Sequence, residues 1–210
     1  MVRTVGPGTS VDIACRCGNV RGTLRGAAPA TVNRVVCYCD DCQAFLHHLG
    51  RADLLDEHGG SDIVQVAPGA LAFHRGTEHL EGMRLGPKGL FRWYARCCKT
   101  PLGNTLTPSI PFVGLVWEAL QGLDAHGRDE VFGPPRAKLE PKYAIGQLPS
   151  NARGVNLPFM ARTLRLVLGW KIRGQAWPHP FFDRTGAPIH PVHALSSTER
   201  DALRPLCGPR

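Results

Sequence analysis

The chain has 210 residues, of which 43% are hydrophobic and 20% charged, a balance that excludes an intrinsically disordered protein and favours a folded globular one. Its formal net charge is +8, but most of its 25 basic residues are scattered arginines that form no long run of like charge. The charge therefore does not favour a nucleic-acid partner, although it leaves one open.

Membrane insertion and export are not expected. No uninterrupted apolar stretch approaches the length needed to cross a bilayer, so we expect no transmembrane segment. The first twenty residues lack the apolar core of a signal peptide, which predicts a cytoplasmic protein. In a reducing compartment, closely spaced cysteines are metal ligands or redox catalysts more often than disulfides.

The first half of the chain predicts β-structure. A hairpin is expected around the tight turn CRCG, with strands over residues 10–14 and 19–26. A helix is expected over 43–60, ended by Gly59 and Gly60. Further alternating or β-branched runs predict strands over 31–39, 61–67, 70–76 and 89–95.

The second half predicts more helix. An early proline and a late glycine favour a short helix over 108–127, and a proline-broken stretch over 131–149 predicts a loop with an edge strand. Ser196 and Glu199 have the spacing of a capping box at the start of a short C-terminal helix. We therefore expect a β core over residues 1–105 and a partly helical extension over 106–210 that packs on it.

One segment of this extension, residues 156–175, predicts an amphipathic helix. Its arginines lie near the face opposite an apolar one, which predicts that the apolar face packs against the domain. The alternative is a basic amphipathic helix on an anionic lipid surface. The expected apolar face contains Met160, Leu164, Val167 and Leu168.

Cysteines carry the strongest chemical signal in the sequence. Side chains two residues apart on a strand share one face, so a C-x-C pair can hold one metal ion between them. A closed structural zinc site has four ligands, whereas a catalytic site has three protein ligands and an open position. Seven of the eight cysteines form three groups, which fit one site of each kind: Cys15 and Cys17; Cys37, Cys39 and Cys42; Cys97 and Cys98.

The segments CRCGNVRGTLRG, CYCDDC and CCKTPLGN resemble, in order and spacing, the glutathione-dependent formaldehyde-activating enzyme and centromere protein V family. The resemblance covers residues 11 to about 105. It implies a mainly β fold, the β-tent of antiparallel sheets with zinc knuckles, and two zinc sites. It also implies that Cys15, Cys17 and Cys98 are structural ligands, and that Cys37, Cys39 and Cys42 form a second site where the sulfur of glutathione binds.

The chain departs from this pattern at the double cysteine. If the sequence TPL fixes the register, Cys98 matches the second cysteine of the family motif and Ala95 takes the place of the first. We expect a bend in the chain here that brings Cys98 to the ion, with Cys97 as the replacement ligand. Cys207 or a histidine is the alternative fourth ligand. The middle motif also differs, because Tyr38 stands where the family often has histidine.

Other candidate residues surround the middle group. His47 or His48 could carry a proton near the open zinc position, and Asp41 could support the site from its turn. A thiol such as glutathione carries carboxylates, which Arg34 or Arg51 could bind. The resemblance implies carbon–sulfur lyase chemistry, in which a small thiol adds to an aldehyde or is released from it. The alternative is a non-catalytic, zinc-stabilised module that binds protein, nucleic acid or anionic membrane.

Overall fold

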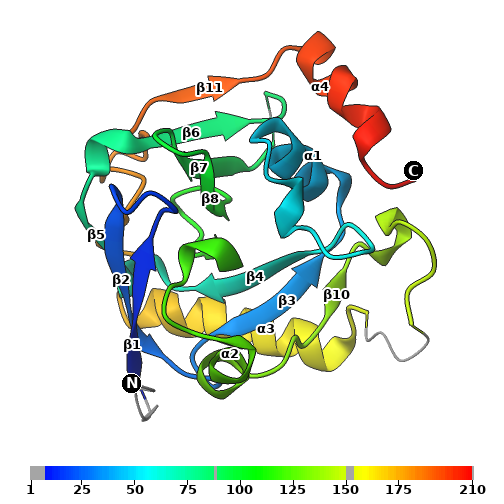
Figure 1. Ribbon diagram of the computed structural model, residues 1–210. Coiled ribbons are helices and arrows are strands. Elements are labelled where there is room, and N and C mark those ends of the chain that lie inside the picture. Colours follow the sequence, from blue (N-terminus) through cyan, green and yellow to red (C-terminus); the bar gives the residue numbers. More distant parts are fainter. Residues whose placement is uncertain (1–7, 88, 150–153, 210) are drawn as a thin grey trace.

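The computed structural model describes residues 8–87, 89–149 and 154–209, and their strands form two sheets (Figure 1). The smaller sheet is antiparallel and has the order β1-β2-β5 (Thr9–Ala14, Arg21–Ala27, Leu71–Arg75). The larger has the order β10-β3-β4-β9-β8-β7-β6-β11 (Lys138–Leu139, Asn33–Cys37, Ser61–Val66, Val113–Val116, Thr100–Thr105, Phe91–Ala95, Leu80–Arg84, Val192–Ala194). Each edge strand is parallel to its neighbour, β10 to β3 and β11 to β6, and the inner strands are antiparallel to one another. The predicted mainly β fold is confirmed.

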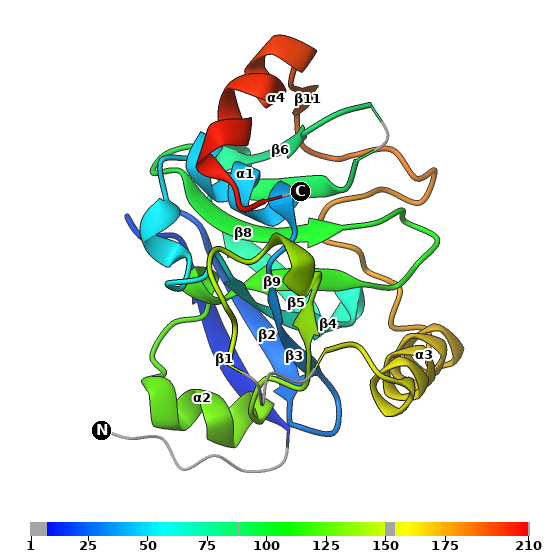
Figure 2. The ribbon, with the colours of Figure 1, turned by 90° about the vertical axis from the view of Figure 1, so that its right-hand side faces the viewer.

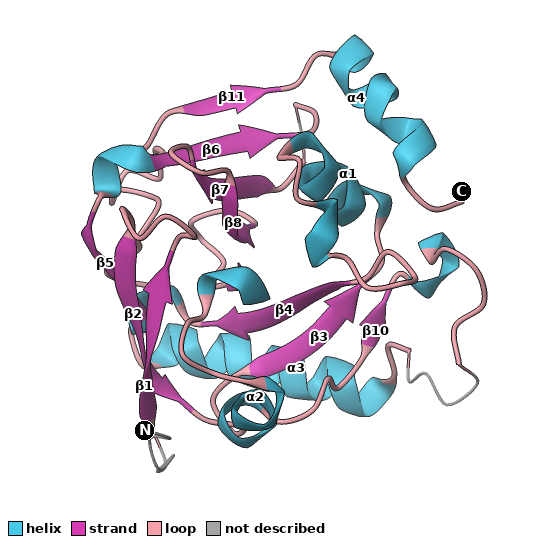
Figure 3. Ribbon diagram, viewed as in Figure 1, coloured by secondary structure: helices cyan, strands magenta, loops and turns pink. Residues whose placement is uncertain are grey.

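The α-helices of the described residues lie around these sheets (Figure 3). None of them is long and apolar enough to cross a membrane. The expected compartment stays a prediction. The helices are α1 (Asp40–His48), α2 (Ala125–Phe132), α3 (Leu157–Ile172) and α4 (Ser197–Leu203).

The main apolar core joins both sheets, with Ile13 of β1 and Leu24 of β2 in one cluster with Trp93 of β7. Trp93 is stacked on Phe181 with a centroid distance of 4.5 Å. On the other face of the large sheet, Tyr94 packs with side chains of α1 in a second cluster. Consequently β7 is buried on both faces, including its one arginine.

Two local predictions are confirmed. β1 and β2 form the expected hairpin, and Gly18 in its turn has φ +76°, a conformation that favours glycine. α4 begins at the expected capping box, in which the Ser196 hydroxyl accepts from the Glu199 amide and the Glu199 carboxylate accepts from the Ser196 amide.

The bounds predicted for the first helix are wrong. α1 begins at Asp40, because the Sγ of Cys39 caps the helix by accepting a hydrogen bond from the Cys42 amide. It ends at His48, where Gly50 with φ +68° takes the left-handed conformation that closes many helices. Only a short 3₁₀ turn, Ala52–Leu54, follows in the rest of the predicted range.

The helix predicted over 108–127 is also wrong for most of its length. Val113–Val116 forms β9, which pairs with β4 on one side and β8 on the other, and α2 begins only at Ala125. All four residues of β9 are buried. A short, continuously apolar run fits a buried strand as well as a buried helix, so its pattern alone could not separate them.

The helix predicted over 156–175 is present as α3, but the face expected to pack is exposed. Met160, Leu164 and Leu168 are 56%, 68% and 52% exposed, whereas Phe159 and Trp170 are buried. Of the expected face, only Val167 is partly buried, beside Leu166 and Trp170. The two aromatic side chains offer the larger apolar area for burial, which decides the orientation of the helix.

The second half of the chain contributes strands to the large sheet. β9 lies near its centre, β10 pairs with β3, and β11 pairs with β6. The division of the chain at residue 105 into a core and an extension stays a prediction.

We predict that Gly103→Ala destabilises the protein, because a Cβ at Gly103 of β8 would lie 2.7 Å from the carbonyl oxygen of Gly114 in β9. Such overpacking lowers the free energy of unfolding by about 1–3 kcal/mol, measurable by urea denaturation. Gly86→Ala is the matched control, because a Cβ there meets no atom within 4 Å. Equal effects of both substitutions would contradict the close contact of β8 with β9.

Candidate metal centres

Four cysteines from two turns form the first group, which we call the four-cysteine cluster: Cys15, Cys17, Cys97 and Cys98. Cys15 and Cys17 lie in the β1–β2 turn and the other two in the β7–β8 turn. The Sγ–Sγ distances are 3.5 Å for Cys15–Cys17, 3.8 Å for Cys15–Cys97 and 3.4 Å for Cys17–Cys97. All four sulfur atoms lie within 4.8 Å of one another, so the cluster could hold a metal ion.

The β7–β8 turn lets adjacent cysteines reach one cluster. Lys99 has φ 56°, in the left-handed region, so the chain bends where a straight strand would point Cys97 and Cys98 to opposite faces. The Thr100 hydroxyl accepts a hydrogen bond from the Arg16 amide at 2.9 Å, which joins this turn to the β1–β2 turn. The predicted bend is present, whereas the role of Cys97 as a ligand stays a prediction.

The second group, which we call the three-cysteine centre, consists of Cys37, Cys39 and Cys42 at the junction of β3 and α1. The Cys37 and Cys39 sulfur atoms are 3.4 Å apart, and all three lie within 4.8 Å of one another. Cys37 and Cys42 are buried and Cys39 is half-buried. In the described part of the chain, no histidine, aspartate or glutamate joins the three sulfur atoms within that distance.

A buried arginine faces the three-cysteine centre. Arg92 of β7 is 1% exposed, and its Nη1 donates a hydrogen bond to the Cys42 sulfur at 3.7 Å. Its Nη2 is 3.9 Å from a carboxylate oxygen of Asp41 and has no hydrogen-bond acceptor among the described residues. Its guanidinium also lies over the ring of Phe45 at 5.5 Å. A buried guanidinium with a free donor indicates a site built for negative charge.

The surroundings of the centre favour a thiolate at Cys42. Hydrogen bonds from Cys37 and Cys39, together with the charge of Arg92, lower the pKa of Cys42 well below its ordinary value. The hydrogen bonds that the Cys37 thiol makes with Cys39 and Cys42 raise its own pKa. A metal bound by all three sulfur atoms would displace the remaining protons, so its affinity would increase with pH.

The four-cysteine cluster also contains one thiol with a lowered pKa. Burial raises the pKa of Cys98, but hydrogen bonds from the Thr100 hydroxyl and from Cys17 outweigh burial and lower it to about 6. Burial raises the pKa of Cys15. A cavity of about 470 Å³ adjoins this cluster, and Cys15, Cys17, Arg16, Arg21 and His74 are among its lining residues.

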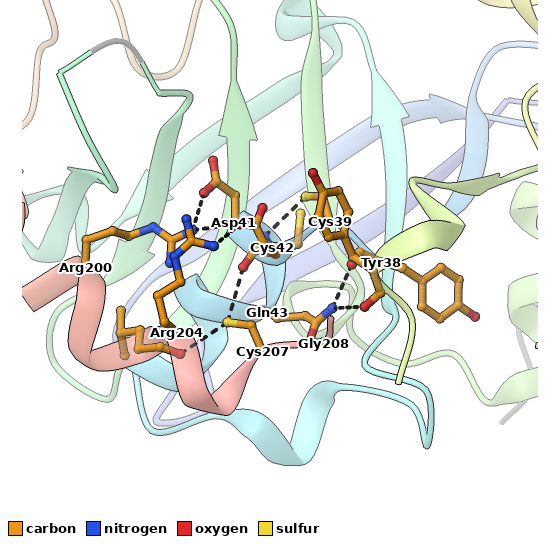
Figure 4. A network of polar contacts seen from close by, with 12 residues as sticks. Tyr38, Cys39, Asp41, Cys42, Gln43, Arg200, Arg204, Cys207 and Gly208 are labelled. Carbon is orange, nitrogen blue, oxygen red and sulfur yellow. Dashed lines mark hydrogen bonds and ion pairs between the residues drawn. The ribbon is translucent and has the colours of Figure 1, made fainter. Parts of the chain in front are cut away.

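The C-terminal segment neutralises two carboxylates beside the three-cysteine centre (Figure 4). Arg200 of α4 lies 3.2 Å from Asp40 and 2.9 Å from Asp41, and Arg204 lies 3.0 Å from Asp40. Both aspartates belong to the first turn of α1, where negative charge is favoured by the helix dipole. The arginines reduce the repulsion that these aspartates would exert on nearby thiolates.

The last described residues pack on the same helix. The Cys207 thiol donates a hydrogen bond to the Asp40 carbonyl at 3.5 Å, and the Gly208 amide donates one to the Gln43 side-chain oxygen at 2.8 Å (Figure 4). Cys207 therefore lies beside α1. It is outside the four-cysteine cluster, for which it was predicted as an alternative fourth ligand.

The other predicted candidates lie near the centre without joining it. His47 and His48 are at the C-terminal end of α1, more than a helical turn from Cys42, and burial lowers the pKa of His48. Asp41 is paired with Arg200. The catalytic roles considered for these residues stay predictions.

The two arginines considered as carboxylate-binding groups are already paired within the chain. Arg34 pairs with Asp62 and Asp129. Arg51 pairs with Asp53 and Glu118. Arg92 was not among the site residues predicted from the sequence. Arg92 and Tyr94 are two residues apart in the strand FRWYA, so their side chains lie on the same face. Only the cover that α1 provides makes that face buried.

The donor sets of both groups fit zinc. A tetrahedral site with zinc–sulfur bonds of about 2.3 Å has sulfur atoms about 3.8 Å apart, close to the separations found here. The sulfur–sulfur contacts of 3.4–3.9 Å are far longer than a disulfide bond, and all eight cysteines are free. Cysteine thiolates also suit other soft metal ions, so the geometry by itself supports a metal and not one element.

We predict that Cys97→Ser lowers the metal content by up to one ion per chain and lowers the melting temperature. Loss of one of four sulfur donors weakens a closed site and the two turns that it joins. Metal content is measured by atomic emission on the purified protein and stability by calorimetry. Cys207→Ser is the matched control, because Cys207 belongs to neither group. Unchanged metal content and stability in Cys97→Ser would remove Cys97 from the ligand set.

We predict that Arg92→Met weakens metal binding at the three-cysteine centre by about 10–100-fold, as loss of a supporting group around a metal site commonly does. Without the guanidinium, the pKa of Cys42 rises, so more protons compete with the metal at a given pH. Competition with a chromophoric chelator measures the affinity. Arg34→Met is the control, since Arg34 is also buried, at 7% exposed against 1% for Arg92, but pairs with carboxylates instead. Equal affinity losses in both variants would mean that Arg92 acts only on folding.

Comparisons with known proteins give one family and a distant structural likeness. No curated protein matches the chain. A crystal structure of a Rhodobacter sphaeroides protein aligns at 18% identity and a TM-score of 0.41, covering 57% of this chain and 96% of its own. The formaldehyde-activating family is not among these findings, so that resemblance stays a prediction. The family model described as "Family of unknown function (DUF6151)" matches residues 8–193, and the chain therefore belongs to this family.

Proposed function

We propose that this protein binds two zinc ions and that the three-cysteine centre binds and activates a small thiol, such as glutathione, for carbon–sulfur lyase chemistry. The observation that carries the proposal is a set of three converging sulfur donors, which no fourth metal-ligating side chain joins among the described residues, beside a buried arginine with one N–H group that has no acceptor there. Three protein ligands are typical of zinc sites that keep a position for substrate.

The two groups have different tasks in this proposal. The four-cysteine cluster supplies a complete set of donors and joins the β1–β2 turn to the β7–β8 turn, which suits a structural ion. At the three-cysteine centre, a bound zinc ion would supply positive charge that lowers the pKa of an incoming thiol. Cys39 is the most accessible of the three ligands, so the thiol would approach from its side.

Residues of the chain prepare this centre for negative charge. Arg92 donates toward Cys42, and the N-terminus of α1 places its amide groups beside Cys39. Arg200 and Arg204 neutralise the acidic pair that precedes Cys42. Three cysteine thiolates and a divalent cation would have a net charge of −1, which Arg92 balances while no substrate thiolate is bound.

The proposed reaction joins the thiol to an aldehyde. The thiolate sulfur forms a bond to the carbonyl carbon, the π electrons of the carbonyl move to its oxygen, and that oxygen takes the proton lost by the thiol. Release of the aldehyde is the reverse step, in which the carbon–sulfur bond breaks. The protein residues hold the sulfur as thiolate and need no redox partner for either direction.

We predict that glutathione perturbs the metal at the three-cysteine centre. Cobalt(II) in place of zinc reports its ligands by visible absorption, so titration with glutathione should change the spectrum saturably when the thiolate becomes a fourth ligand. S-methylglutathione is the matched ligand control, because it has the same carboxylates and no thiol. Carbon–sulfur lyase activity is then measured with glutathione and formaldehyde.

Cys39→Ser separates the two centres in this experiment. It should weaken the spectral response to glutathione while metal at the four-cysteine cluster remains bound. If neither glutathione nor another small thiol alters the wild-type spectrum, the enzyme proposal fails, and both metals are structural.

A further inference from the structure

α3 presents an apolar stripe to solvent along its whole length. The five side chains recur every three or four residues, so they share one face of the helix. We call them the α3 stripe: Leu157 (77% exposed), Met160 (56%), Leu164 (68%), Leu168 (52%) and Ile172 (76%). Large apolar side chains at these exposures, contiguous on one face, mark an interaction surface.

The helix cannot turn to bury this stripe, because its opposite face is fixed. Leu166 and Trp170 pack with Ala67, and Phe159 packs in the cluster of the three-cysteine centre. Arg162 donates hydrogen bonds to the Val32 carbonyl at 2.9 Å and to the side chain of Asn33 at 3.0 Å. Figure 2 shows α3 nearly end-on at the margin of the molecule, where its outer face is free.

The charged side chains that flank the middle of the α3 stripe are positive. Arg165 and Lys171 are exposed and each lies three residues from Leu168, so both flank the middle of the stripe. No aspartate or glutamate occurs between residues 154 and 182. An anionic surface would complement this face, because the long Lys171 and Arg165 side chains can extend past the apolar groups to reach it.

A cavity at the inner edge of α3 extends this cationic surface. It has a volume of about 380 Å³, and Arg25 of β2, Arg165 and Arg173 line it together with apolar side chains that include Leu166 and Trp170. Within the described residues, none of these three arginines forms an ion pair with a carboxylate. An anionic group with an apolar body fits such a lining.

We propose that α3 is an interfacial helix that docks the protein on an anionic phospholipid membrane, with the α3 stripe in the acyl boundary and a lipid phosphate at the arginine-lined cavity. A basic amphipathic helix with few acidic residues has this mode of binding. α3 lies on the bilayer and does not cross it, because its 16 residues extend only about 24 Å. A second copy is a poorer partner, because two α3 helices face to face would oppose like charges.

Co-sedimentation with vesicles tests this proposal on the full-length, zinc-loaded protein. Phosphatidylcholine vesicles that contain phosphatidylglycerol should bind it at least tenfold more tightly than pure phosphatidylcholine, and added salt should weaken the binding. Leu164→Gln and Leu168→Gln should each weaken it roughly tenfold through lost apolar burial. Arg25→Gln and Lys171→Gln should each weaken only the anionic binding, about fivefold.

Ile189→Gln is the matched control, because Ile189 is 50% exposed but lies outside α3. It should bind as wild type does, and unchanged zinc content and melting temperature in every variant would show that folding is intact. No binding to anionic vesicles overturns the proposal. Equal loss with Ile189→Gln also overturns it. A dimer in sedimentation velocity that Leu164→Gln dissociates, without vesicle binding, would assign the stripe to a second copy instead.

Discussion

Burial of β7 on both faces is the constraint on which both candidate metal centres depend. One face places Trp93 in the core between the sheets, and the other places Arg92 and Tyr94 under α1. This position puts the Arg92 guanidinium beside Cys42, while the end of the same strand turns into Cys97 and Cys98. A shift of β7 by one residue would exchange its faces and disturb both centres together.

Charge balance is the second requirement of the three-cysteine centre. Thiolates in a largely buried place are costly unless cations or amide dipoles face them. Here α1 supplies its N-terminus and β7 supplies Arg92, while α4 contributes Arg200 against the acidic pair of α1. The C-terminal segment thus belongs electrostatically to a site whose cysteines lie in the first quarter of the chain.

The sequence predicted local features better than long-range ones. Cysteine spacing indicated the three-cysteine group and the Cys15–Cys17 pair, and the capping box of α4 was readable, because these depend on residues a few positions apart. The association of Cys97 with Cys15 and Cys17, 82 and 80 residues away, was expected only from the number of ligands and from the family resemblance. β9 was mistaken for a helix because VGLV fits either element, and only its partners β4 and β8 decide. The face of α3 was misjudged because Phe159 and Trp170 occupy the core, and Arg92 was missed because the cover over its face comes from α1.

α3 and the three-cysteine centre share an apolar cluster, in which Phe159 packs with Val35, Cys37, Cys42 and Ile63. The far end of β3 is tied to the same helix, since the Asn33 side chain donates to the Thr163 hydroxyl at 2.9 Å. The helix is therefore fixed to the strand that ends at Cys37. If α3 docks on a membrane and the three-cysteine centre binds a thiol, as proposed, this packing would hold the membrane surface at a constant orientation to the centre without a conformational change.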